Sequence, residues 1–177
     1  FELYHGVIEN IGFFGGEPLL LTNKKIIEYI INKAPDANYS IITNGYYLEE
    51  YFPLFQNLNI LNIQVTLDGP REVHNKTRTL CNGRGTYDKI LSGIKLYAEH
   101  NIPITIRMNI SKENYHDCLV EKEKLENIAW GKSLRFEMQP IFQNLAKEKN
   151  ELYDALITKD VDAYNKNVIL QRLKPIS

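Results

Sequence analysis

Short runs rich in β-branched and aromatic residues alternate along this chain with longer segments whose apolar residues recur every three to four positions. The first pattern indicates buried strands, and the second indicates amphipathic helices. Strands are predicted at 8–14, 39–43, 61–67, 104–110 and 134–141, and helices at 23–34, 48–58, 86–100 and 111–128. A strand-helix order repeated about five times requires a parallel sheet with right-handed crossovers and helices outside it. The sequence therefore predicts an α/β fold.

Three details of this pattern bear on the local structure. Pro53 falls within the predicted helix 48–58, so it must lie in the first turn or divide the helix. Thr86 is predicted to cap the helix at 86–100. The connection 68–85 is polar and long for a compact domain, and such long connections are often functional loops.

The composition limits the classes of function. The 177 residues suffice for one domain with its own core, and 44% apolar with 24% charged residues is the balance of an ordinary globular protein. A formal charge of -1 gives no reason to expect a nucleic-acid partner or an anionic membrane surface. No apolar run has the length that a bilayer requires and no signal segment opens the chain, which predicts a cytoplasmic location.

Three of the predicted strands end in turns made of glycine and polar residues. The first is followed by Gly15-Gly16-Glu17-Pro18, the second by Thr43-Asn44-Gly45, and the third by Thr66-Leu67-Asp68-Gly69-Pro70. Successive glycines free the backbone to approach a ligand closely. Because the carboxyl ends of parallel strands meet at one end of a sheet, these turns are predicted to form a single ligand-binding rim.

In this order and spacing, the three turns resemble the radical S-adenosylmethionine enzymes, and more narrowly their peptide- and sulfatase-maturating (SPASM-like) branch. The segments 82–87 and 106–110 continue the match, so that the resemblance covers about 8–141. It implies a partial TIM-like (β/α)6 barrel, with a parallel sheet and outer helices, whose first strand-helix unit is missing here. Residues 1–146 would be a truncated core with strands two to six, and 147–177 a helical segment that packs on the core or leads out of it.

The resemblance also implies which residues bind S-adenosylmethionine (AdoMet). They are Gly15, Gly16, Glu17, Pro18, Asn44, Thr66, Asp68, Arg78, Arg107 and Asn109. The main chain of the turn 15–17 would hold the amino group of AdoMet. Asn44, Thr66 and Asp68 would line its ribose and methionine side, and Asn109 would contact the adenosine.

Either of two arginines would meet the carboxylate of the cofactor, because a fixed guanidinium fork suits a carboxylate. Both have another interpretation: Arg107 could pair with Glu137 on the next predicted strand, and Arg78 could be a solvated surface residue. Asp68 and Asn44 precede glycines and are also good turn formers.

For the intact protein, the resemblance implies reductive cleavage of AdoMet at a [4Fe-4S] cluster. The product is a 5′-deoxyadenosyl radical that takes a hydrogen atom from a peptide or small protein, with a reductant such as flavodoxin or ferredoxin. The family holds this cluster with three cysteines spaced C-x-x-x-C-x-x-C, whereas this chain has only Cys81 and Cys118. We therefore expect no metal ligands in this chain, a cysteine loop upstream of it, and no activity from the fragment alone.

Two other functions fit the same residues. A barrel enzyme acting on a phosphorylated metabolite would use Glu17 and Asp68 as acid and base and the glycine-rich segment 82–86 as a phosphate loop. A non-catalytic module that has lost the cluster would bind a nucleoside or a peptide.

Two further predictions concern the surface of the chain. Glu72 and His74 of the connection 68–85 could lie near the mouth of the barrel, but they are predicted to form surface ion pairs. An open sheet edge predicts self-association or marginal stability.

Overall fold

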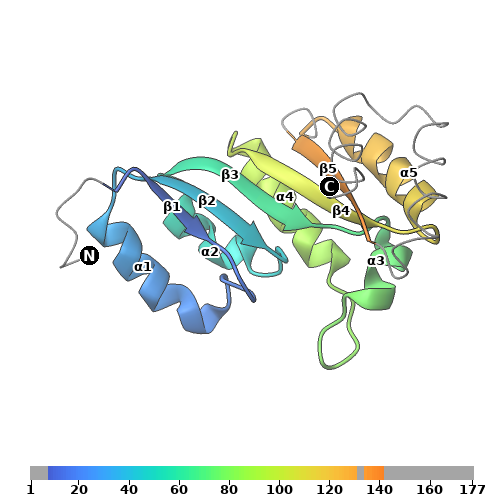
Figure 1. Ribbon diagram of the computed structural model, residues 1–177, viewed down its shortest axis with the longest axis horizontal. Helices are drawn as coiled ribbons and strands as arrows, with labels where there is room; N and C mark the ends of the chain where they lie inside the picture. The colour runs from blue at the N-terminus through green and yellow to red at the C-terminus, as the bar shows by residue number, and fades with distance from the viewer. Residues whose placement is uncertain (1–7, 131–133, 142–177) are drawn as a thin grey trace, which may run out of the picture.

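A five-stranded parallel sheet forms the centre of the molecule. The computed structural model describes residues 8–130 and 134–141. The strands lie side by side in sequence order (Figure 1), and all are parallel. They are β1 (Asn10–Phe13), β2 (Asn38–Thr43), β3 (Asn59–Thr66), β4 (Ile104–Ile110) and β5 (Leu134–Pro140). This arrangement confirms the α/β fold predicted from the alternating pattern.

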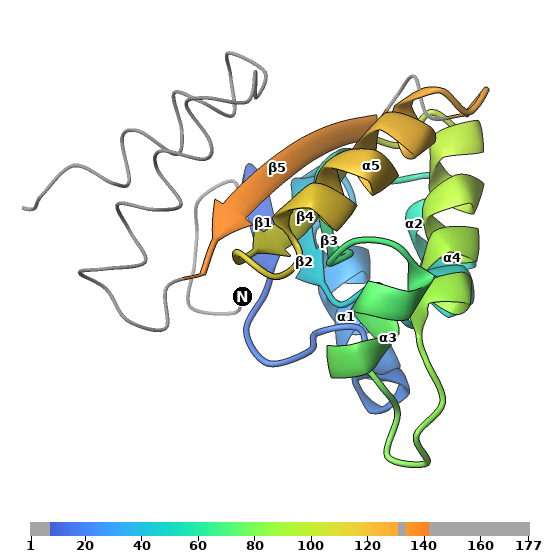
Figure 2. The same ribbon diagram turned by 90° about the vertical axis from the view of Figure 1, so that its right-hand side faces the viewer.

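The helices connect successive strands. They are a short 3-10 helix η1 (Leu21–Asn23), α1 (Lys24–Lys33), α2 (Leu48–Phe55), α3 (Arg71–Thr77), α4 (Tyr87–Glu99) and α5 (Tyr115–Glu126). Figure 2 shows α2, α4 and α5 on one face of the curved sheet. The core fills the space between them, and it includes Ile63 and Val65 of β3, Ile106 of β4, Ile94 of α4 and Leu125 of α5.

The opposite face of the sheet, here called the polar face, carries a different set of side chains. Along β4, four buried apolar residues alternate with the half-buried Thr105, Arg107 and Asn109. Since successive side chains of a strand point to opposite faces, Arg107 and Asn109 share the polar face, as the alternation predicted. Gln64 and Thr66 occupy the same face of β3, because register pairs them with Thr105 and Arg107.

Two local predictions were wrong. The connection 68–85 is not a continuous loop, because α3 occupies Arg71–Thr77 directly after Pro70. The seven residues are too few to give a clear helical period in the sequence. Pro53 neither lies in the first turn of α2 nor divides it: the helix continues through Pro53 and ends at Phe55. A proline this close to a helix end removes one intrahelical hydrogen bond at most.

The predictions for the C-terminal segment and for self-association remain open. Residues 147–177 lie beyond the described part of the chain, so the proposed helical segment there is untested. β1 is an edge strand of the sheet, as the expectation of self-association requires, and the association itself stays a prediction. Within residues 8–130 and 134–141, no helix combines the length and the apolar character that crossing a membrane requires.

Candidate functional site

The turn after β1 leaves its backbone open on one side. Gly15 and Gly16 have φ angles of +87° and +52°, which L side chains rarely adopt. A Cβ atom placed on either glycine would meet no atom within 4 Å. The glycines are therefore required by the backbone conformation and not by crowding, and the space in front of them can receive a ligand. Pro18 follows, and its carbonyl accepts a hydrogen bond from Asn23 Nδ2 at 3.1 Å.

The carboxylate of Glu17 joins this turn to the end of β2. Oε1 accepts hydrogen bonds from Leu19 N at 2.9 Å and from Thr43 Oγ1 at 2.6 Å, while Oε2 accepts one from Asn44 N at 2.7 Å. Leu19 itself is fully buried in the core. Both carboxylate oxygens are thus engaged within the protein, so Glu17 holds the turn in place and leaves its main chain to face a ligand.

Asn44 faces the rim with part of its side chain uncommitted. Its Oδ1 accepts a hydrogen bond from Tyr46 N at 2.8 Å. The following Gly45 has a φ angle of +84°, and a Cβ there would lie 2.5 Å from Val65 Cγ1. Glycine is therefore obligatory at this position. The turn sequence Thr43-Asn44-Gly45 fixes where Asn44 stands at the carboxyl end of β2.

Asp68 is the centre of a second cluster, directly after β3. Oδ1 accepts hydrogen bonds from Asn109 N at 2.8 Å and Asn109 Nδ2 at 3.0 Å, and Oδ2 accepts one from Arg78 Nε at 2.6 Å. A carboxylate offers about four acceptor positions, so these three donors leave room for about one more. The structure thus brings together three residues that the sequence placed on three separate segments.

Arg78 is neither a free surface residue nor fully buried. Its side chain is 34% exposed and forms an ion pair with Asp68, whose side chain is 11% exposed. Because the Nε atom makes this contact, the two terminal nitrogens of the guanidinium remain available for a carboxylate. The prediction that Arg78 could be merely solvated is therefore wrong.

Arg107 lies on the polar face of β4, in register with Thr66 of β3 and Glu137 of β5. Its Nε atom is buried and has no hydrogen-bond partner, and the same holds for Nε2 of Gln64. No ion pair joins Arg107 to Glu137, although both belong to the described part of the chain. A buried donor without an acceptor is unfavourable, so these atoms favour a ligand on the polar face.

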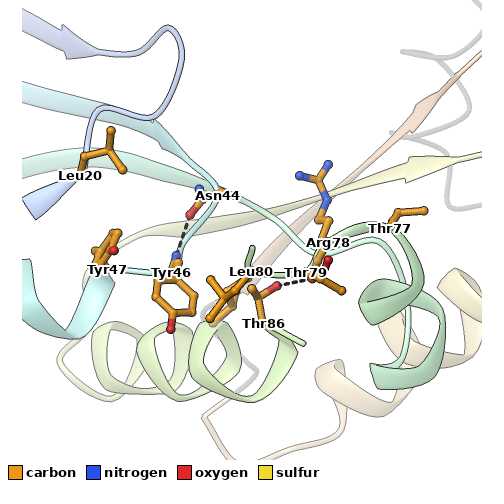
Figure 3. A pocket seen from close by; sticks show the side chains of 10 residues that line it. Leu20, Asn44, Tyr46, Tyr47, Thr77, Arg78, Thr79, Leu80 and Thr86 are labelled. Atoms are coloured by element: carbon orange, nitrogen blue, oxygen red, sulfur yellow. Dashed lines mark hydrogen bonds between the residues drawn. The ribbon is translucent and has the colours of Figure 1, made fainter. Parts of the chain in front are cut away.

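A pocket of about 340 Å³ is lined by one residue from each cluster, Asn44 and Arg78. Figure 3 shows Asn44 and Tyr46 on one side of it and Arg78 and Thr79 on the other, with Leu80 and Thr86 between them. Its lining contains one arginine and no acidic residue. Pockets of this size suit a small organic molecule or part of one.

His74, which was predicted to form a surface ion pair, is completely buried. It lies on α3, and its two ring nitrogens contact Asp68 N and Thr86 Oγ1, each at 3.1 Å. Burial lowers the pKa of His74 to about 4, although the neighbouring Asp68 opposes this shift. The sequence could have revealed His74 only if α3 had been recognised, because the helix turns this residue inward.

The amino end of α4 does not resemble a phosphate loop. Asn75 Oδ1 accepts hydrogen bonds from Thr86 N at 2.9 Å and Tyr87 N at 3.1 Å, so these donors are already engaged. Thr86 occupies the predicted cap position without a side-chain cap bond, since its hydroxyl donates to Arg78 O at 2.9 Å. With the carboxylates of Glu17 and Asp68 also engaged, this geometry weighs against a phosphate-binding barrel with these acids as catalysts.

The cysteines do not form a metal centre. Cys81 is exposed in the connection between α3 and α4, while Cys118 is buried in α5. Burial raises the pKa of the Cys118 thiol to about 12, so the thiol stays protonated at neutral pH. Two cysteines placed in this way cannot supply the three thiolates that the family's cluster needs. No group of three or more metal-binding side chains occurs within the described residues.

Comparison with known proteins decides the family. The model of the radical SAM superfamily matches residues 2–121, which is more than half of the chain. The chain belongs to the radical SAM superfamily. It is 34% identical over 110 residues to a cysteine-type anaerobic sulfatase-maturating enzyme of Clostridium novyi, a match that covers 56% of this chain and 29% of that enzyme.

Other radical SAM proteins are similar to the same region. A GTP 3′,8-cyclase of Campylobacter jejuni is 30% identical over 112 residues, covering 62% of this chain and 33% of the cyclase. The matched region thus spans about a third of the length of these relatives. The structure of native anSMEcpe with bound AdoMet and the Kp18Cys peptide has a TM-score of 0.63 and 16% identity, with coverage of 86% and 48% of the two chains. This likeness confirms the radical SAM type of fold.

Proposed function

We propose that this chain binds AdoMet at the carboxyl end of its sheet, as the cofactor-holding part of an enzyme that modifies a peptide or protein. The junction of Asp68, Arg78 and Asn109 carries this proposal, because Arg78 lines the pocket and is held there by Asp68, a carboxylate that keeps about one free acceptor position. Membership of the radical SAM superfamily supports it.

The residues of the site offer a chemical partner for each polar group of AdoMet. The open main chain of Gly15 and Gly16 suits the amino group, which needs close approach to backbone acceptors. The remaining acceptor position of Asp68 suits a ribose hydroxyl. The terminal nitrogens of Arg78 and the buried, unpartnered Nε of Arg107 are two candidates for the carboxylate.

Asn44, Thr66 and Asn109 have supporting roles in this proposal. Asn44 lines the pocket beside the glycine turn, and Thr66 ends β3 next to Arg107 in register. Asn109 donates hydrogen bonds to Asp68 from its main-chain N and from Nδ2, so it first positions this carboxylate. Its Oδ1 and the second hydrogen of Nδ2 remain for the adenosine. When bound, AdoMet supplies the one-electron chemistry of the family together with a [4Fe-4S] cluster.

A peptide or protein is the substrate class that we propose for the whole enzyme. The similarity to a sulfatase-maturating enzyme supports it, as does the fold shared with a neighbour that is in complex with a peptide. This chain alone is proposed to bind AdoMet without cleaving it, because Cys81 and Cys118 do not fit the cluster.

The glycine amides provide a direct test of where AdoMet binds. Gly15, Gly16, Gly45 and Gly69 all lie at the proposed rim, whereas Gly93 is buried in α4 against Leu48. In ¹H–¹⁵N correlation spectra of the ¹⁵N-labelled chain, adding AdoMet should shift the amide signals of the rim glycines and leave the amide signal of Gly93 unchanged. Shifts confined to other parts of the chain, or none at saturating AdoMet, would contradict the proposed site.

A further inference from the structure

His74 contacts both members of the Asp68–Arg78 ion pair. Its ring accepts a hydrogen bond from the main-chain N of Asp68 at 3.1 Å. Its own carbonyl accepts one from Arg78 N at 3.0 Å. Within the described residues, the ring has one other polar contact, with Thr86 Oγ1, whose hydroxyl donates to Arg78 O at 2.9 Å. The backbone of Arg78 is thereby held at its N–H and at its carbonyl.

These contacts fix the protonation of the ring. A threonine hydroxyl has a single proton, and Thr86 uses it for Arg78 O. Nε2 of His74 must therefore donate to Thr86 Oγ1, while Nδ1 accepts from Asp68 N. The ring is neutral with its proton on Nε2, and a second proton on Nδ1 would face the N–H of Asp68.

We propose that His74, as the neutral Nε2–H tautomer, is the positioning residue that sets the geometry of the Asp68–Arg78 pair and through it the affinity for AdoMet. The part concerning affinity rests on the proposed function. The part concerning geometry does not, because the ion pair exists in the chain without ligand. His74 touches no ligand-facing surface itself, being fully buried, so it acts only through its neighbours.

Three substitutions distinguish the roles of the two ring nitrogens of His74. His74→Asn retains an acceptor near the position of Nδ1, His74→Gln retains a donor near the position of Nε2, and His74→Phe removes both while keeping a ring of similar shape. His116→Phe on the exposed side of α5 is the matched control. All variants are made in the full chain, and near-UV circular dichroism verifies their tertiary packing.

The first readout needs no cofactor. Long-range ¹H–¹⁵N spectra at pH 7 should show the Nε2–H tautomer for His74 in the wild-type chain. The Nε–H signal of Arg78 should be protected from solvent exchange in wild type, His74→Asn and His116→Phe, and should lose this protection in His74→Phe. A proton on Nδ1, or an equally protected Arg78 signal in His74→Phe, would overturn the proposal. If His74→Phe does not fold, two measurements decide the proposal. They are the tautomer of His74 in the wild-type chain and the protection of the Arg78 Nε–H signal in His74→Asn compared with His74→Gln.

The second readout is AdoMet affinity by titration calorimetry. We expect a loss of about tenfold in His74→Phe, the size of one net hydrogen bond, and a smaller loss in His74→Asn. Unchanged affinity in folded His74→Phe would overturn the link to AdoMet. If wild type fails to bind AdoMet, the proposed function fails, whereas the Arg78 signal still decides whether His74 positions the ion pair.

Discussion

Glu17 Oε1 lies 2.6 Å from Thr43 Oγ1, so that one carboxylate ties the glycine turn after β1 to the last residue of β2. The same side chain accepts hydrogen bonds from Leu19 N and Asn44 N. The rim is therefore built by hydrogen bonds between its turns before any ligand arrives. Its two carboxylates, Glu17 and Asp68, organise one half of the rim each.

Replacing Glu17 by Gln should loosen this connection. The amide would keep one acceptor oxygen but would turn its NH2 group toward either Thr43 Oγ1 or Asn44 N, both of which donate to the carboxylate, and the charge-assisted bonds would be lost. For a partly exposed carboxylate we expect a loss of about 1–2 kcal/mol in the free energy of unfolding, measured by urea denaturation. Glu28→Gln on the exposed face of α1 is the control, and an equal effect of both substitutions would refute the role of Glu17.

Two glycines with similar backbone angles should respond differently to substitution by alanine. Gly45 and Gly83 have φ angles of +84° and +80°, but a Cβ on Gly45 would lie 2.5 Å from Val65 Cγ1, and one on Gly83 would meet nothing. Gly83→Ala should cost about 1 kcal/mol of stability from the backbone alone. Gly45→Ala adds overpacking and should cost about 2–4 kcal/mol. Equal midpoints of urea denaturation would contradict the packing of this turn.

Arg78 should control AdoMet affinity through the geometry of its guanidinium. Arg78→Lys keeps the positive charge but cannot contact Asp68 and a carboxylate at the same time through a planar fork. We expect Arg78→Lys and Arg78→Ala to weaken AdoMet binding by about 10- to 100-fold in titration calorimetry. Arg84→Ala, at the exposed tip of the same loop, should bind as wild type does. If Arg78→Lys binds AdoMet with wild-type affinity, the guanidinium does not bridge Asp68 and the carboxylate of the cofactor.

Buried His74 should make stability depend on pH. Its pKa is lowered to about 4 in the folded chain from the ordinary 6.5, so the unfolded chain binds more protons between these values. The stabilising contribution is thus complete above pH 6.5 and is lost as the pH falls toward 4, on the order of 3 kcal/mol in total. The charged groups that contribute are Asp68, which raises the pKa, and Arg78, which lowers it.

Urea denaturation between pH 4.5 and 7 measures this contribution. Wild type should lose stability on acidification more steeply than His74→Asn, since asparagine does not titrate. His116→Asn, at an exposed position of α5, should follow wild type. Parallel curves for wild type and His74→Asn would show that His74 is not held neutral by the fold.

The sheet could be predicted from the sequence, but the contacts between side chains at its rim could not. Alternation of apolar residues in 104–110 predicted β4 with its bounds and placed Arg107 and Asn109 on one face, because strand periodicity is a local property. The links of Glu17 to Asn44 and of Asp68 to Asn109 join residues 27 and 41 positions apart, which no local pattern encodes. His74 was missed because α3 is too short to produce a helical period.

Binding of AdoMet to the folded chain tests the central claim most directly. Titration calorimetry of the 177-residue chain should show one AdoMet bound with a Kd below about 1 mM, weakened at least tenfold by Arg78→Ala. S-adenosylmethionine should be recovered intact from the mixture, because no cluster is bound. A folded chain that shows no binding heat at several millimolar AdoMet, or that binds it equally well without the Arg78 side chain, would contradict the account.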